Sequence, residues 1–147
     1  MAAVTACHIN TPIFEEYRQF EDLSWNRFDI LEFSAEVEEQ QSPVDIFLNI
    51  RHLPEIPYKS MTISYTIYSP AGDMRSSEYS FELIDQEGNS LSNCMGDYCD
   101  LMVPIREAFV FSEPGRVKFE IENKYTKMEM PGIIEVGLIM KKSKEED

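Results

Sequence analysis

The segment RHLPEIPY, residues 51–58, places several chemically versatile side chains close together. Arg51 carries a guanidinium, His52 an imidazole, Glu55 a carboxylate and Tyr58 a phenol. These groups are the kinds that catalytic and ligand-binding loops use. The same segment contains two prolines and lies between two apolar runs, VDIFLNI and MTISYTIY, so it also fits a rigid connection between two strands.

The two prolines decide how this segment is interpreted. Each forces the residue before it into an extended conformation, so the backbone is stiff and Tyr58 points in a fixed direction. Physical chemistry alone therefore favours a structural role, in which Arg51 caps carbonyl groups or pairs with a carboxylate on a neighbouring strand, and His52 is a hydrogen-bonded, partly buried imidazole. The segment could also serve as a contact surface, whose candidate residues are Arg51, His52, Glu55 and Tyr58.

The rest of the chain offers little for catalysis or metal binding. The chain has two histidines, His8 and His52, and no GxSxG, HExxH or glycine-rich phosphate motif. The turns AGDMRSSE and DQEGN lack the alternating oxygen ligands of a calcium loop. We therefore predict a protein that is not an enzyme and needs no metal or cofactor. The enzyme alternative requires a deep pocket that gathers His52 with two carboxylates.

Three cysteines remain. Cys94 and Cys99 are too far apart for a CxxC redox motif, and in an exported protein they could close a small disulfide loop. Cys7 is then left over, and the preceding residues, VTA, make it look like the lipidated cysteine of a bacterial lipobox. Only six residues precede Cys7 and none is basic, unlike a signal peptide. Either this likeness is chance, or Met1 is an internal start and the signal has been lost.

From residue 28 onward, apolar and polar residues alternate along most of the chain, so the elements that position the residues of RHLPEIPY and the cysteines Cys94 and Cys99 are predicted to be strands. A period of two is typical of strands with one buried face. Turn segments rich in Pro, Gly, Asn and Asp separate the alternating runs. About seven to nine short strands at even spacing predict an all-β fold, an antiparallel β-sandwich of immunoglobulin-like or jelly-roll type. The alternating apolar sets begin at Leu31, Val44, Met61, Tyr79, Val117 and Ile134.

Length and charge limit the function classes. The 147 residues, 43% of them hydrophobic, predict one folded domain over 25–141, after a lipobox remnant and lead-in over 1–24 and before a charged tail over 142–147. The net charge of −14 argues against nucleic acid and anionic lipid surfaces as direct partners. No apolar run reaches about 18 residues, so the sequence as written predicts no transmembrane helix.

Several motifs in order carry a family resemblance. LNIRHLPEIPY is similar to a strand that ends in an Arg-His pair and a Tyr-Pro-Tyr-like turn, with Ile56 in place of the first tyrosine. FELIDQEGN, EPGRVKFEIENKY and MEMPGIIEVGLIM follow in the expected order. Together with the lipobox at Cys7, this set resembles the gliding-motility lipoprotein GldH family of the Bacteroidetes over about residues 7 to 140. The segment NSLSNCMGDYCD departs from the tryptophan- and glycine-rich stretch of the family.

The resemblance implies a lipoprotein anchored through acylated Cys7 to the inner or outer membrane and facing the periplasm. It implies a non-enzymatic structural or assembly component of gliding or secretion machinery, with other envelope proteins as partners. The alternative from the residues themselves is a carbohydrate-binding β-sandwich, in which exposed aromatic rings would stack on sugars. The candidate rings are Tyr17, Trp25, Tyr65, Tyr68 and Tyr98.

Overall fold

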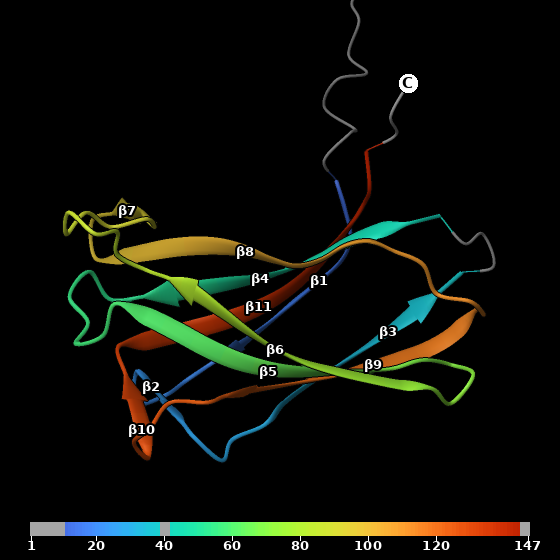
Figure 1. Ribbon diagram of the computed structural model, residues 1–147, viewed down its shortest axis with the longest axis horizontal. Coiled ribbons are helices and arrows are strands. Elements are labelled where there is room, and N and C mark those ends of the chain that lie inside the picture. The colour runs from blue at the N-terminus through green and yellow to red at the C-terminus, as the bar shows by residue number, and fades with distance from the viewer. Residues whose placement is uncertain (1–10, 39–41, 145–147) are drawn as a thin grey trace, which may run out of the picture.

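The protein is an antiparallel β-sandwich, as the alternation predicts. The computed structural model describes residues 11–38 and 42–144, which contain eleven strands and no helix. Two sheets face each other, and a short two-stranded ribbon closes one end of the sandwich (Figure 1). The five-stranded sheet contains, in spatial order, β1 (Pro12–Gln19), β11 (Ile133–Lys142), β4 (Val44–His52), β8 (Tyr98–Phe109) and β7 (Asn93–Met95).

The second sheet has four strands. In spatial order these are β3 (Leu31–Val37), β9 (Gly115–Asn123), β5 (Ser60–Tyr68) and β6 (Met74–Glu82), while β10 (Glu129–Pro131) and β2 (Ser24–Asn26) form the ribbon. The antiparallel pairs β1–β11, β3–β9, β4–β8 and β5–β6 are nested in sequence, like one long hairpin that has been rolled up. This nesting is the jelly-roll topology, one of the two sandwich types that the sequence left open.

The core lies between the inner faces of the two sheets, where the alternation predicts it. Ile46, Leu48 and Ile50 on β4 face Ile63 on β5 and Phe119 on β9, and all five are fully buried. Burying each such side chain contributes about 1.5–3 kcal/mol relative to leaving it in water. The core is therefore large enough to hold the two sheets together.

The sequence prediction needs two corrections. Residues 12–19, which the sequence places in the lead-in, form β1 and pair with β11. Arg18 on β1 also donates to the carbonyl of Glu32 on β3 at 2.6 Å, which ties the two sheets together. In β11 the pairing with β4 shifts between Ile133 and Glu135, so Ile133, not Ile134, is fully buried. A β-bulge changes the face of the residues before it.

The two ends of the sandwich are distinct. Pro12 pairs with Lys141, and Val44 pairs with both Lys142 and Phe109, so these residues mark one end, here called the Pro12 end. At the other end, called the His52 end, His52 pairs with Cys99 and with Ile133. The RHLPEIPY segment, the β7 hairpin and the β2–β10 ribbon all gather at the His52 end (Figure 1).

The single tryptophan gives a direct test of this core. Trp25 is fully buried, its indole Nε1 donates to the carbonyl of Asp29 at 2.8 Å, and its ring stacks on Phe20 at 5.7 Å. We expect blue-shifted native fluorescence that iodide barely quenches, and a red shift on unfolding in urea. A native emission maximum equal to that of the unfolded chain would contradict the buried position.

Candidate functional site

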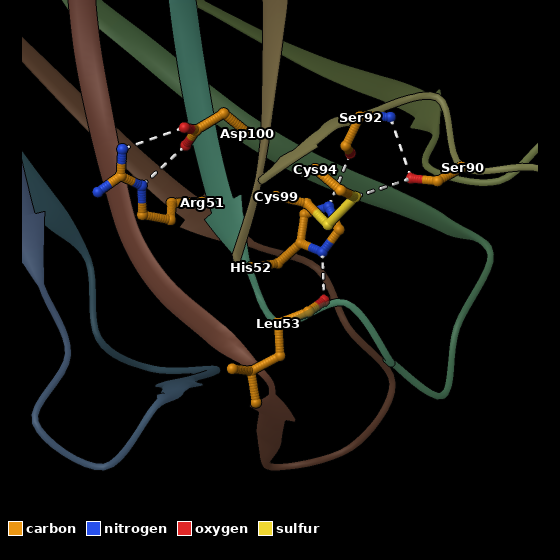
Figure 2. Close-up of a disulfide and its surroundings, with 8 residues drawn as sticks. All are labelled: Arg51, His52, Leu53, Ser90, Ser92, Cys94, Cys99 and Asp100. Atoms are coloured by element: carbon orange, nitrogen blue, oxygen red, sulfur yellow. Dashed lines mark hydrogen bonds and ion pairs between the residues drawn. A yellow bond between two sulfur atoms is a disulfide. The ribbon is translucent and has the colours of Figure 1, made fainter. Parts of the chain in front are cut away.

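Arg51 and Asp100 form a two-point ion pair on the outer face of the five-stranded sheet. The β4–β8 register places them directly opposite each other. Arg51 Nε donates to Asp100 Oδ1 at 2.9 Å, and Nη2 donates to Oδ2 at 3.0 Å (Figure 2). Asn49 Nδ2 donates to Oδ1 at 3.2 Å, and the guanidinium lies 4.1 Å from the centre of the Tyr98 ring. The arrangement fixes Arg51 by bidentate bonding and by stacking.

Each partner stabilises the charge of the other. The hydrogen bonds from Arg51 lower the pKa of the Asp100 carboxyl, although partial burial acts in the opposite direction. The hydrogen bond to Asp100 correspondingly raises the pKa of Arg51. Both side chains remain about one-third exposed, at 33% and 28%, so water weakens the attraction. The pair therefore has the geometry of a structural clamp whose contribution is moderate.

His52 points the other way, into the molecule (Figure 2). It is only 2% exposed, and its Nδ1 lies 2.7 Å from the carbonyl oxygen of Leu53. A carbonyl can only accept, so Nδ1 carries a proton. Nε2 lies 2.7 Å from the hydroxyl of Ser92, which in the neutral ring donates to it. Both ring nitrogens are thus occupied by neutral structural partners, Leu53 and Ser92, and not by the two carboxylates that the enzyme alternative would gather with His52 in a deep pocket.

A disulfide closes the adjacent hairpin. Cys94 on β7 and Cys99 on β8 are register partners and are joined by a disulfide (Figure 2). Chain-entropy arguments give about 2 kcal/mol for a loop this short. Because β7 has only three residues, the disulfide supplements a weak ladder. It holds Ser92 beside His52 and Tyr98 beside Arg51, so the hairpin supports both sides of the β4 end.

The segment after His52 is held rigidly against the β10–β11 turn. Leu53 N donates to the carbonyl of Gly132 at 2.8 Å, and the Tyr58 hydroxyl donates to the carbonyl of Pro131 at 2.6 Å. Gly132 has a φ of +85°, and a Cβ there would lie 2.8 Å from Ile56 Cγ2, so glycine is needed for both conformation and space. Burial raises the pKa of Tyr58.

The four candidate contact residues therefore do not share one surface. Arg51 lies on the outer sheet face, His52 is buried, and Tyr58 packs edge-on against Tyr125 at 5.4 Å. Only Glu55 is freely exposed. The prediction that His52 is an exposed contact is wrong, because the β4 alternation turns its side chain inward. Cys7, the predicted lipidation site, lies outside the described residues.

The five candidate sugar-stacking rings also lie in different places, some in the core and some on the outer faces of the sheets. Trp25 and Tyr65 are core residues, 0% and 3% exposed, and cannot act as platforms. Tyr68 lies on the outer face of the four-stranded sheet, bonded to Glu120. Tyr17 and Tyr98 both lie on the outer face of the five-stranded sheet. Two of the five candidates therefore share a face.

Sequence reasoning missed two residues that organise these regions. Asp100 was not singled out, and only the β4–β8 register shows it opposite Arg51. Asn123 was also missed. It is 1% exposed, and its amide donates to the carbonyl of Trp25 at 3.3 Å while its side-chain oxygen accepts from Tyr125 N at 3.1 Å. Nothing in the local sequence distinguishes either residue from other polar residues in strands.

The described part of the chain gives no metal centre. Within residues 11–38 and 42–144, no cluster of three or more His, Cys, Asp or Glu side chains is arranged to hold a metal ion. Over the same residues, no helix is long and apolar enough to cross a membrane.

Comparison with known proteins identifies the family. The model of the GldH lipoprotein family matches residues 12–140, from the start of β1 almost to the end of β11. The chain belongs to the GldH lipoprotein family. A curated relative, the gliding motility lipoprotein GldH homolog of Christiangramia forsetii, is 23% identical over 138 residues that cover 89% of this chain and 84% of the relative.

Family membership establishes the broad setting of this GldH-family chain. It is a lipoprotein of a gliding-motility family, which implies a membrane-anchored place in the cell envelope. The resemblance deduced from the ordered sequence motifs is confirmed. The family is not known as a family of enzymes.

Two carbohydrate-binding proteins are among the solved structures that show a weak similarity to this chain. One is the module CBM28, specific for non-crystalline cellulose, with 8% identity, coverage of 88% of this chain and 73% of that chain, and a TM-score of 0.43. Another is TmCBM61 in complex with β-1,4-galactotriose, with 14% identity, coverage of 94% and 93%, and a TM-score of 0.36. Because both scores are below 0.5, these likenesses carry no argument about function.

The ion pair yields a stability prediction. We expect Arg51→Ala to lower the melting temperature at pH 7 by roughly 3–6 °C, because it removes two charge-assisted hydrogen bonds and the stacking on Tyr98. Thermal unfolding followed by circular dichroism measures the change, with Arg116→Ala as the control because its ion pair with Glu36 is largely exposed. An unchanged melting temperature together with lost function would instead indicate a contact role.

The same comparison should depend on pH. Because the folded-state pKa of Asp100 is lowered, its contribution is fully present above the ordinary pKa of about 4 and is lost as the pH falls through the folded pKa. The difference between wild type and Arg51→Ala should therefore be largest at pH 6–7 and shrink below about pH 4. A difference that grows in acid would contradict this assignment.

Proposed function

We propose that this protein is a non-enzymatic assembly component of the gliding or an associated secretion machinery, held at the membrane by a lipid on Cys7 and facing the periplasm. The observation that carries the proposal is the start of the family-matched sandwich at Pro12, five residues after Cys7. Five extended residues span at most about 18 Å. A lipid on Cys7 would therefore hold the Pro12 end near the membrane.

The net charge is consistent with attachment through an anchor rather than through direct contact with lipid. The chain carries a net charge of −14, so an anionic lipid surface repels it while the lipid anchor retains it. A single acyl chain binds membranes only marginally, so the cysteine would need more than one. Under this arrangement the sandwich stands away from the bilayer and directs its His52 end towards other envelope proteins.

The His52 end suits a rigid contact. Its segment 53–59 is fixed by the bonds to Pro131 and Gly132, so binding a partner would cost little loop entropy. Glu55 is exposed at the centre of this segment and supplies a negative charge for a basic patch on a partner. The proposal accordingly assigns the contact to Glu55 and its exposed neighbours Pro54 and Pro57.

The lipid anchor can be tested by metabolic labelling. We expect palmitate to label the protein when the gene is expressed in its native host from its own upstream sequence, and Cys7→Ser to abolish the labelling. The double substitution Cys94→Ser and Cys99→Ser is the matched control, because it removes the other two thiols and should keep the label. Equal labelling of wild type and Cys7→Ser would overturn the anchor.

The contact assignment can be tested by charge reversal. We expect Glu55→Arg to reduce the co-purification of envelope partners about tenfold, an effect of about 1.4 kcal/mol, without changing the melting temperature. Glu113→Arg is the matched control, since Glu113 is also exposed but lies in the turn between β8 and β9 at the Pro12 end. Equal losses in both variants would point to bulk charge, and no loss in either would exclude this surface.

A further inference from the structure

The outer face of the five-stranded sheet is hollowed. A shallow depression of about 460 Å³ crosses the four strands β1, β11, β4 and β8. At about 4.8 Å between neighbouring strands, its width is about 14 Å. Tyr17 and Glu15 line one side of it and Met102 and Asp100 the other, with Asn49 and Ile139 between them. Its size suits a short oligomeric ligand that lies across the strands.

Tyr17 provides an aromatic surface in this hollow. Its register partner on β11 is Gly137, and a Cβ at that position would lie 2.3 Å from Tyr17 Cε1. The ring therefore lies directly against the backbone of β11, which glycine alone allows. The hydroxyl donates to the carboxylate of Glu15, and the side of the ring away from the sheet faces solvent, since the residue is 39% exposed. The ring is thus held in place before any ligand arrives.

Beyond this ring, the hollow is lined by both apolar and polar groups. Met102, across the hollow, is 44% exposed and supplies the accessible apolar surface, while Ile139 in the lining is 3% exposed and nearly covered. Asn49 and Asp100 offer planar polar groups beside them, held by their mutual hydrogen bond of 3.2 Å. A sugar presents the same mixture, because its C–H faces are apolar and its rim carries hydroxyl groups that both donate and accept.

The charged residues that line the hollow disfavour anionic ligands. Glu15, Glu135 and Asp100 line the hollow with Arg51 and Lys141, so the formal charge of its lining is −1. Arg51 is already committed to Asp100, and Gln19 donates to Glu135 at 3.2 Å. The hollow therefore has no free cationic cluster for a phosphate or a polyanion. Burial, followed by the bond to Glu15, raises the pKa of Tyr17 to about 12, so the phenol stays neutral.

We propose that this hollow is a binding site for a neutral oligosaccharide, which stacks on Tyr17 and hydrogen-bonds to Asn49 and Asp100. The inference does not depend on the lipid anchor or on the contact at Glu55. It assigns to the side of the sandwich a ligand distinct from the protein partner at its His52 end.

The test is a glycan array followed by isothermal titration calorimetry with the purified 147-residue chain. The array carries neutral β-linked oligosaccharides and their uronic-acid and sulfated counterparts. We expect binding to neutral members. Tyr17→Ala should weaken that binding at least about tenfold, because it removes the stacking surface. Tyr17→Phe should stay within about threefold of wild type, since it keeps the ring.

Two controls separate binding from folding. Tyr68→Ala removes a partly exposed tyrosine from the outer face of the other sheet and should leave binding unchanged. Melting temperatures show whether Tyr17→Ala still folds, and Asn49→Ala should weaken binding without touching the ring. No neutral glycan bound at millimolar concentration, binding of anionic glycans alone, or binding that Tyr68→Ala abolishes and Tyr17→Ala spares would each overturn the proposal.

Discussion

The register between β4 and β8 is the constraint on which both faces of the five-stranded sheet depend. It places Arg51 opposite Asp100 on the outside and His52 opposite Cys99 on the inside. A slip of one residue would move every side chain of β4 to the other face, burying a guanidinium and exposing three isoleucine or leucine residues. The buried core therefore fixes the geometry of the outer hollow, and the ion pair and the disulfided hairpin fix the end of the same two strands.

The sequence alone predicts which residues face the core in those strands where apolar and polar residues alternate strictly. Alternation identified the inner residues of β3, β4, β5 and β9, because each of these strands has one face in the core. It failed for β1, an edge strand in which Glu15, Glu16 and Tyr17 are exposed in succession, so that its residues show no period of two. It also failed at the start of β11, where a bulge shifts the burial from Ile134 to Ile133, and no single residue type signals a bulge.

The sequence predicts what kind of partner the residues of the candidate site have, but it does not predict which residue each partner is. The structural interpretation of Arg51 as a partner of a carboxylate on a neighbouring strand agrees with the geometry, but the identity of Asp100 required the pairing of strands 49 residues apart. For His52 the sequence supports two interpretations, a hydrogen-bonded, partly buried imidazole or an exposed contact residue. The structure agrees with the first, because His52 is buried and bonded to Ser92. The role of Gly137 depends on Tyr17, which is 120 positions away in sequence. Contacts of this range follow from topology, which local patterns do not encode.

The jelly-roll topology gives three separate regions to one small domain. Its nested pairing brings the start of β1 and the end of β11 together at the Pro12 end, so an anchor near the N-terminus leaves the opposite end free. The loops at that opposite end are tied by backbone hydrogen bonds, which would suit the proposed fixed contact with a protein. The broad outer face of the five-stranded sheet extends along the strands between these two ends. Its hollow is shaped by Gly137 and Tyr17 rather than by loops. Because the three proposed regions use different residues, substitutions at Cys7, at Glu55 and at Tyr17 test the proposed anchor, the proposed protein contact and the proposed ligand site separately.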